Sequence, residues 1–378
     1  MVRLDEREWR RFPVDSLFRT VRRGSKTYMP TGALVSPRDL EPGDIPRIRV
    51  TSRTNGINGF TAQSQDPSFK TRRNFISESF LGSVFYHPYL ASLDMKVHAL
   101  TLVDRSLNAD LALFLTVMLG NNTHGTTYGN QISSADLARQ LIMLPVDPAT
   151  GEPDWAFMEA YVAERRERLL AAARTFLSRR LEALRRTVAA DVAAGRTDGL
   201  DEREWRRFRV GGLFDITSGS VIGNRDRIPG DLPLVSASIQ RNGVIDFIGN
   251  DGLVTGHDVI GVTRDGMPGM ALWHGHRAAF THNVRLLHPK APNVRKAMDE
   301  AVGLFVATVI TGQHDKYRYG YTCGTARLAR QLIMLPVDPA TGEPDWAFME
   351  AYARRVMLAR MEEAYAFLER TDAGTRRA

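Results

Sequence analysis

The sequence predicts an α+β protein in which two pseudo-symmetric, mixed β-rich domains are separated by an antiparallel pair of long α-helices. The main observation is a repeat: LARQLIMLPVDPATGEPDWAFMEAY begins at Leu137 and again at Leu328, and LDEREWRRF begins at Leu4 and again at Leu200. Each copy of the longer segment ends a stretch rich in turn residues and opens a stretch with helical periodicity. The length of 378 residues also suits two domains.

The repeat predicts four segments along the chain. We expect a first β-rich domain at 1–150, a first long helix at 151–196, a second β-rich domain at 197–341 and a second long helix at 342–378. Between the identical anchors the copies match weakly. Asn55-Gly56 and Asn242-Gly243 lie 187 positions apart and are typical turn pairs between strands. Identical ends with different interiors indicate one scaffold that performs two different tasks.

Each long helix has a predicted start and an apolar stripe. Asp154 and Asp345 stand at the N-cap position, and Gly195 is expected to end the first helix. The stripe of the first helix, expected over 155–194, contains Leu170, Leu177, Leu181, Leu184, Val188 and Val192. The stripe of the second helix, expected over 346–370, contains Met349, Tyr352, Val356, Met361, Tyr365 and Leu368. Pairing of the two helices is the simplest way to bury both stripes, and folding of each helix onto its own β-rich domain is the alternative.

Composition narrows the class of protein. The 50 Lys and Arg against 43 Asp and Glu give a net charge of +7, a modest excess that is compatible with a nucleic-acid partner. A single cysteine, Cys323, excludes an internal disulfide framework and favours a reducing, cytoplasmic location. The N-terminal residues lack the apolar region of a signal peptide, and no apolar run reaches the length of a membrane span, so no membrane partner is expected.

Both copies carry a series of short motifs in one order: a Glu-Trp-Arg start followed by Leu-Phe, then Gly-Asp-Ile/Leu-Pro, a Tyr-Gly turn and Leu-Pro-Val before the helix. This order of motifs resembles the specificity (S) subunit of type I restriction-modification systems and of the related type IIB and IIG enzymes. The resemblance covers essentially the whole chain. It implies two target recognition domains, each reading half of a split DNA site, and a helical spacer that docks other subunits.

The resemblance also implies the partners and cofactors. The partners would be double-stranded DNA, two adenine methyltransferase subunits and, in a type I system, a restriction and translocation subunit. No cofactor is expected on this chain, because S-adenosylmethionine, ATP and Mg²⁺ would belong to the partner subunits. The spacer and subunit interface would include Leu170, Leu177, Leu181, Leu184, Val188, Met349, Tyr352, Val356, Met361 and Tyr365. A scaffold with twin β domains that binds proteins and no DNA is the alternative from another class.

Candidate DNA contacts are polar side chains of the kinds that pair with base edges or phosphates. At matching positions of the copies these are Arg47, Arg49, Thr51, Arg53, Thr54 and Asn55, then Ser236, Ser238, Gln240, Arg241 and Asn242. Further basic or aromatic candidates are Lys70, Arg72, Arg73, Tyr128, His274, His276, Arg277, Lys316, Tyr317, Arg318 and Tyr319. A solvated strand or loop remains the alternative for each of them. The arginines from Arg165 to Arg186 could follow the DNA backbone or face solvent and other subunits.

Catalytic motifs are not expected on this chain. We find no methyltransferase tetrapeptide and no phosphate-binding Gly-Lys-Ser/Thr motif. Asp94-Met95-Lys96 matches half of a nuclease motif, but the second copy has Thr281 at the position of Asp94. His274, His276 and His282 lack a nearby carboxylate or thiol for a metal site, so we interpret them as loop or structural histidines. Cys323 has no neighbouring base in sequence and is interpreted as a plain thiol.

Overall fold

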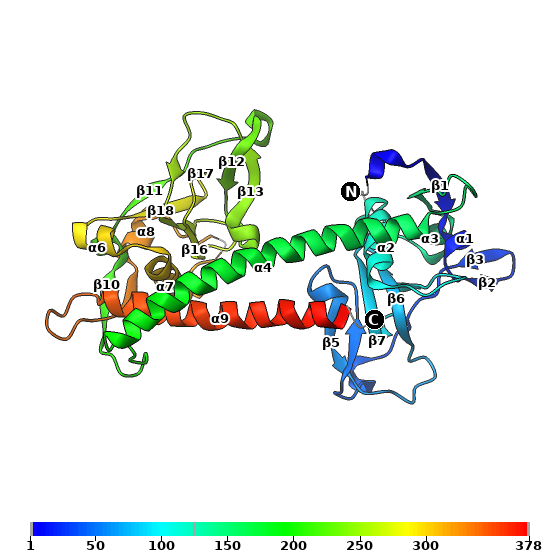
Figure 1. Cartoon of the computed structure of the whole chain (residues 1–378), viewed down its shortest axis with the longest axis horizontal. Helices are drawn as coiled ribbons and strands as arrows, with labels where there is room; N and C mark the ends of the chain where they lie inside the picture. The colour runs from blue at the N-terminus through cyan, green and yellow to red at the C-terminus, as the bar shows by residue number, and fades with distance from the viewer. Residues whose placement is uncertain (1–2, 124–125, 319, 376–378) are drawn as a thin grey trace. The chain divides into compact units, whose positions relative to one another are not determined.

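The structure is a computed structural model that describes residues 3–123, 126–318 and 320–375 (Figure 1). The chain divides into two compact units, Met1–Ala172 and Ala173–Ala378, and the boundary falls inside the long helix α4. No helix among the described residues is both long enough and apolar enough to cross a membrane.

The first unit is built on a five-stranded sheet with the order β5-β4-β7-β6-β8. Its central pair, β4 and β7, is parallel, and the other neighbours are antiparallel. The strands are β1 (Trp9–Pro13), β2 (Val21–Arg23), β3 (Lys26–Tyr28), β4 (Ile45–Ile48), β5 (Ile57–Thr61), β6 (Thr71–Ser79), β7 (Val84–Leu93), β8 (Val97–Leu100) and β9 (Leu141–Pro145). The helices are α1 (Val14–Leu17), α2 (Ala109–Asn121), α3 (Ser134–Arg139) and α4 (Trp155–Ala193), with 3-10 turns at Leu4–Glu6, Pro37–Asp39 and Thr54–Gly56.

The second unit repeats this plan with two four-stranded sheets, β11-β18-β15-β16 and β13-β12-β17-β14. Its strands are β10 (Trp205–Arg209), β11 (Phe214–Ser218), β12 (Pro229–Val235), β13 (Val244–Ile248), β14 (Thr255–Gly256), β15 (Val259–Thr263), β16 (Ala271–His274), β17 (Ala278–Phe280), β18 (Val284–Pro289) and β19 (Leu332–Pro336). Its helices are α5 (Val210–Leu213), α6 (Pro292–Ala297), α7 (Glu300–Thr311), α8 (Thr325–Arg330) and α9 (Trp346–Thr375), with 3-10 turns at Asn224–Asp226, Gln240–Gly243 and His314–Lys316.

The identical segments build identical parts in the two units. In the first, β1 pairs antiparallel with β9 so that Trp9 faces Pro145, and in the second, β10 pairs with β19 so that Trp205 faces Pro336. The indole N–H of Trp9 donates to the Leu4 carbonyl at 3.1 Å, and that of Trp205 makes the corresponding bond to Leu200 at 2.8 Å. The prediction of one scaffold built twice is therefore confirmed.

Both long helices start at the predicted aspartates. The Asp154 carboxylate accepts the backbone N–H of Phe157 at 2.9 Å, and Asp345 accepts that of Phe348 at 2.9 Å. The other carboxylate oxygen accepts from an arginine that precedes β1 or β10: Arg7 pairs with Asp154, and Arg203 pairs with Asp345. Each aspartate therefore joins the helix start to the strand pair beside it.

The first long helix ends at Gly195 as predicted. Gly195 has a φ of +73°, the left-handed conformation that favours glycine. Its N–H donates to Val192, and the N–H of Arg196 reaches back to the Asp191 carbonyl at 2.9 Å. These two bonds cover carbonyls that the helix end would otherwise leave open. The second helix ends at Thr375, five residues later than predicted.

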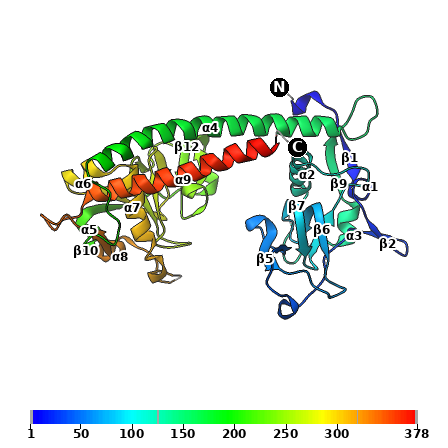
Figure 2. The ribbon, with the colours of Figure 1, turned by 60° about the horizontal axis from the view of Figure 1, so that its bottom comes forward.

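Within the second unit, the last turns of α4 run antiparallel to α9, which confirms the predicted helix pair (Figures 1 and 2). Arg174 pairs with Glu369, Arg185 with Glu362 and Arg354 with Asp191, so residue numbers rise along one helix as they fall along the other. The apolar share of this contact is smaller than predicted. Leu181 is buried and Leu177, Leu184 and Val188 are half-buried, whereas Val192 and Val356 are 49% and 42% exposed.

The first turns of α9 pack into the core of their own unit. Met349 is fully buried in the cluster that contains Phe305 of α7, and the Tyr352 ring meets the Phe305 ring edge-on at 6.1 Å. Met349 and Tyr352 therefore contribute to a β-domain core, as the alternative reading of the stripe anticipated. Further along the helices, Met361, Tyr365 and Leu170 are half-buried.

The cap at Asp345 makes a stability prediction. Asp345→Ala removes the acceptor for the Phe348 N–H and the partner of the part-buried Arg203, so the free energy of unfolding should fall by about 1–2 kcal/mol. Asp345→Asn keeps a capping oxygen and should lose less. Urea denaturation followed by tryptophan fluorescence checks this, and equal stability of Asp345→Ala and the wild-type protein would contradict it.

Candidate nucleic-acid interface

A left-handed turn occurs at the same place in each unit, directly after the central parallel strand. The φ angles are 49°, 54° and 76° along Thr54–Gly56, and 51°, 53° and 79° along Arg241–Gly243. Non-glycine residues adopt such angles rarely, and an asparagine beside a glycine tolerates them best. Two separate segments of one chain thus share an unusual backbone.

The same hydrogen bonds close both turns. The Asn55 amide donates to the Tyr86 carbonyl at 3.2 Å, and the Asn242 amide donates to the Trp273 carbonyl at 2.9 Å. At the base, Arg49 N–H donates to the Gly56 carbonyl at 2.9 Å, and Ser236 N–H donates to Gly243 at 3.0 Å. Asn55 and Asn242, which the sequence singled out as DNA contacts, thus hold the frame of each turn.

The side chains at the tip of each turn differ between the units. Arg53 and Thr54 are exposed in the first unit, where the second unit exposes Gln240 and Arg241. Thr51 and Ser238 are half-buried and accept the N–H of Arg53 and of Gln240 through their hydroxyls, both at 3.2 Å. One backbone frame therefore presents two different sets of polar groups.

Six of the exposed arginines near these turns and loops are not ion-paired within the described part of the chain. They are Arg53, Arg72 and Arg73 in the first unit and Arg241, Arg277 and Arg318 in the second. The arginines of α4 behave differently. Six of the eight between Arg165 and Arg186 pair with carboxylates of the same chain, namely Arg166, Arg168, Arg174, Arg180, Arg185 and Arg186. Most arginines of α4 are thus ion-paired, whereas these six arginines of the β-rich domains keep their charge available for phosphate.

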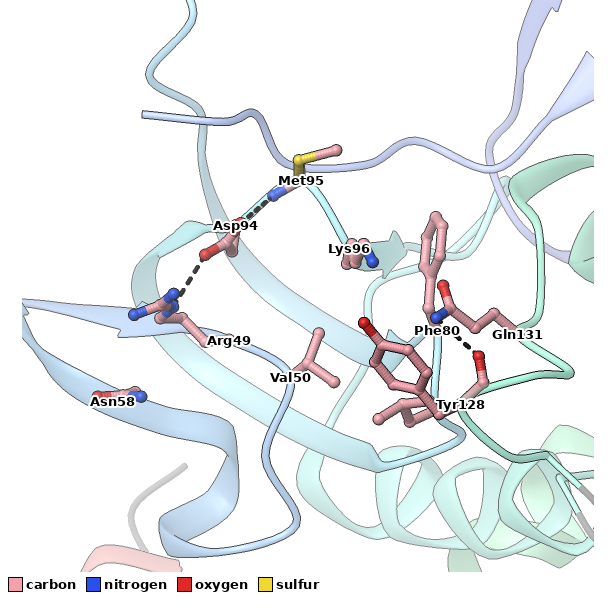
Figure 3. Close-up of a pocket in the computed structure, with 10 residues that line it drawn as sticks. Arg49, Val50, Asn58, Phe80, Asp94, Met95, Lys96, Tyr128 and Gln131 are labelled. Carbon is pink, nitrogen blue, oxygen red and sulfur yellow. Dashed lines mark hydrogen bonds and ion pairs between the residues drawn. The ribbon is translucent and has the colours of Figure 1, made fainter. Parts of the chain in front are cut away.

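A cavity of about 440 Å³ opens beside the turn of the first unit (Figure 3). Arg49, Asn58 and Asp94 line one side, and Phe80, Tyr128 and Gln131 line the other. The Tyr128 side chain is 83% exposed, so its ring is available for stacking. The cavity offers aromatic faces together with charged groups.

Asp94 is held by arginines. Its Oδ2 accepts from Arg49 Nε at 2.9 Å and lies 3.8 Å from Arg47 Nη2, and its Oδ1 accepts the Met95 N–H at 2.6 Å. In the second unit the corresponding positions, Ser236 and Thr281, form a hydroxyl pair in which Thr281 donates at 2.9 Å. Asp94, the first residue of the partial nuclease motif Asp94-Met95-Lys96, is thus part of an ion-pair cluster. The described residues contain no group of three or more His, Cys, Asp or Glu able to hold a metal ion.

Three residues predicted to contact DNA are buried, and the prediction is corrected for them. His274 has no exposed surface, and Arg47 and Tyr317 are 6% and 8% exposed. Burial lowers the pKa of His274 to about 4 and, against the effect of Asp94, lowers the pKa of Arg47. The Tyr317 hydroxyl donates to Gln331 at 2.6 Å, which fixes it inside the unit. These three side chains therefore lie in the interior, beneath the exposed candidates.

Of the remaining predicted contacts, Thr51, Ser236 and Ser238 are half-buried, and the others are exposed or lie outside the described residues. His276 and Arg277 follow the buried His274 on an exposed loop, and Lys316 is exposed beside Gln313, to which it donates. Lys70 donates to the Thr31 carbonyl at 3.3 Å. Tyr319 lies outside the described residues.

A buried polar network beneath the first turn was not predicted. His87 on β7 bonds to Ser77 at 2.8 Å and to the Tyr89 hydroxyl at 3.2 Å, and that hydroxyl is 3.4 Å from the Asn55 amide. Strand register makes His274 the counterpart of His87, since they face Val259 and Phe75 at matching places. The shared spacing of 187 positions between the two histidines was the available signal in the sequence.

Glu78 is the other unexpected member of this sheet. It is fully buried opposite His98 on β8, and neither carboxylate oxygen has a hydrogen-bond partner among the residues that the structure describes. Burial raises the pKa of Glu78 to about 8, so the carboxyl is protonated at neutral pH. Burial also lowers the pKa of His98 to about 4, so this pair is neutral.

Comparison with known proteins gives a consistent result. Residues 7–172 match the family model described as the type I restriction modification DNA specificity domain. The specificity subunit S.BcgI of the type II restriction enzyme BgcI from Heyndrickxia coagulans is 30% identical over 253 residues, which are 66% of this chain and 67% of that protein.

A solved structure with a TM-score above 0.5 shares the fold. The S subunit of a type I restriction-modification system from M. genitalium superimposes with a TM-score of 0.51 at 14% identity, covering 97% of this chain and 95% of that one. The HsdS subunit from Thermoanaerobacter tengcongensis has a TM-score of 0.31 at 14% identity, with coverage of 96% and 94%.

The left-handed turns make a paired prediction. Asn242→Gly keeps the backbone angle and loses only the bond to Trp273, so the free energy of unfolding should fall by about 1 kcal/mol. Asn242→Ala also strains the backbone and should cost about 2–3 kcal/mol. Urea denaturation of both variants measures the difference, and an Ala variant as stable as the Gly variant would argue against strain at this turn.

Glu78 makes a pH prediction. A glutamate in the unfolded chain has an ordinary pKa near 4.5, but burial raises the pKa of Glu78 in the folded protein to about 8, so the folded state binds more protons between these two values. The free energy of unfolding should therefore fall as pH rises across this window. Glu78→Gln should flatten that slope and stabilise the protein at pH 8 by on the order of 2 kcal/mol. Thermal melts from pH 5 to pH 8 test this, with exposed Glu152→Gln as the control that keeps the slope.

Proposed function

The chain belongs to the family of DNA specificity subunits of restriction-modification systems, whose members are non-catalytic, and we propose that it directs its system to one bipartite, asymmetric DNA site. Each β-rich domain reads one half-site. The observation that carries this proposal is the pair of left-handed turns with one backbone and different polar tips.

The exposed residues divide into two roles. Arginines without a carboxylate partner, such as Arg72 and Arg73 or Arg277 and Arg318, suit phosphate contacts that fix the position on DNA. The turn residues Arg53 and Thr54, and Gln240 and Arg241, suit base edges in the major groove. Because the polar side chains of the two turns differ, the two half-sites differ and the whole site is asymmetric.

The unread gap belongs to the same proposal. The domains follow one another along a chain in which α4 alone has 39 residues, so two short half-sites separated by unread base pairs are expected. The division into 1–150, 151–196, 197–341 and 342–378 stays our working definition of the recognition domains and spacer helices.

Two copies of one partner are expected because the chain carries one apolar surface twice. Trp9, Phe114 and Tyr161 form an aromatic group in the first unit, and Trp205, Phe305 and Tyr352 form its equivalent in the second. Val117 is 61% exposed on α2, close to the first group in sequence, and an apolar groove of about 730 Å³ lies beside the second group. We propose that these surfaces bind two adenine methyltransferase subunits, which bring S-adenosylmethionine.

The nuclease partner defines the type of system. A type I system adds a subunit that uses ATP and Mg²⁺ to restrict and translocate DNA, whereas a type IIB or IIG system combines nuclease and methyltransferase in one partner. The family model is named for type I and the curated relative for type II, so both contexts are supported.

A methylation map tests the function. DNA from cells that express the chain with its methyltransferase should carry one gapped, two-part methylated motif, and cells lacking only this chain should not. Replacing residues 13–136 with the segment of another family member should change one half-site only. Methylation that is unaffected by loss of the chain would favour the protein scaffold.

The salt dependence of DNA binding distinguishes a DNA specificity subunit from a scaffold that binds only proteins. Phosphate contacts release counterions, so the affinity of the complex for duplex DNA should fall steeply from 50 to 200 mM salt, by at least about tenfold. Fluorescence anisotropy with a labelled duplex measures this. A scaffold that binds only proteins would show no such affinity.

A further inference from the structure

The ion pair between Arg49 and Asp94 leaves one end of Arg49 free. The pair uses the Nε of Arg49, at 2.9 Å from Asp94 Oδ2, and no hydrogen bond or ion pair of its two terminal nitrogens occurs among the described residues. The side chain is 45% exposed and lines the cavity beside the first turn (Figure 3). Two parallel N–H donors therefore point away from the pair in a fixed planar fork.

Asp94 is equipped to orient Arg49. Its side chain is 15% exposed, and both of its oxygens already accept hydrogen bonds, from Arg49 and from the Met95 backbone. The buried Arg47 lies on the same carboxylate at 3.8 Å and stabilises its charge. A carboxylate held from three directions fixes the guanidinium beside it, which reduces the entropy that Arg49 would lose on binding.

A guanidinium that offers two parallel N–H donors matches the edge of one base best. In the major groove guanine presents two acceptors, N7 and O6, whereas adenine presents an acceptor and a donor, thymine one acceptor and cytosine a donor. A phosphate is a poorer match here, because the Asp94 carboxylate next to the fork repels a second anion. Arg72 and Arg73 of the same unit have no carboxylate partner among the described residues and suit phosphate better.

We propose that Arg49, positioned by Asp94, reads a guanine in the half-site of the first recognition domain. This inference rests on the proposed function and names one base of its target. In the second domain the corresponding positions form the Ser236–Thr281 hydroxyl pair, which has no guanidinium. At this position the second domain therefore reads its half-site without a guanidinium. The two domains share the same backbone here, so replacing one pair of side chains by another changes the base that is read.

The test uses the full chain assembled with its methyltransferase subunits. Competition binding is measured with duplexes that carry each of the four base pairs at every position of both half-sites. The variants are Arg49→Lys, which keeps the charge and loses the fork, Asp94→Asn, which weakens the orienting pair, and the double variant Arg49→Ser with Asp94→Thr, which installs the pair of the second domain. Arg139→Lys is the matched control, because Arg139 forms an exposed ion pair with Asp136 away from the cavity.

The expected result is a loss confined to one position. The wild-type complex should prefer guanine there by about 5- to 150-fold, the range expected of one bidentate contact. The double variant should abolish that preference, and Arg49→Lys and Asp94→Asn should reduce it. The second half-site should be unchanged in every variant, which also shows that the complex is folded, and Arg139→Lys should behave as the wild type.

Three results would overturn the inference. Unchanged base preferences in the double variant would remove Arg49 from base reading. A uniform loss of affinity over all duplexes would make Arg49 a phosphate contact, and a loss at an A·T pair would exclude guanine. If the wild-type complex has no gapped target at all, the proposed function fails as well, so the two failures are distinguishable.

Discussion

The bond between an arginine before the first strand and the aspartate that caps the long helix is the contact on which the rest of each unit depends. It joins Arg7 to Asp154 and Arg203 to Asp345. Each aspartate also binds the first turn of its helix, and each arginine lies over the ring of a phenylalanine in that turn, Phe157 or Phe348. Because the junction needs an arginine, an aspartate, a tryptophan and a phenylalanine at fixed spacing, the two segments that supply them are the ones repeated without change.

Much of the architecture was predictable because local signals agreed with the global plan. Asp154, Asp345 and Gly195 mark helix ends through backbone chemistry that needs no tertiary information. Burial was less predictable. His274, Arg47 and Tyr317 stand among polar residues in the sequence and were therefore predicted to lie on the surface. In the structure, the strand that contains His274 pairs with its neighbour so that the side chain is buried, and Arg47 is buried beside Asp94. The pairing of Arg49 with Asp94 joins residues 45 positions apart, and only the parallel strands bring them together.

The arginines of α4 and those around the turns differ in how far their charge is neutralised by carboxylates. Those of α4 are mostly neutralised by carboxylates of the same chain, so the helix gains little attraction for a polyanion. Those around the turns keep their charge available. Under the proposed function, a protein of modest net charge thereby concentrates its attraction for DNA where polar side chains can also read bases, and the long helices remain available for apolar and ionic contacts with other proteins.

The pairing of β1 with β9, and of β10 with β19, places the two ends of each recognition domain side by side. A domain whose entry and exit strands are hydrogen-bonded to each other behaves as a cassette: the chain between them can lengthen, shorten or change its surface without moving the junction to the helix. The two copies already differ in length inside this closure. Evolution can therefore exchange one cassette for another, and under the proposed function a new half-site requires changes only within the exchanged segment.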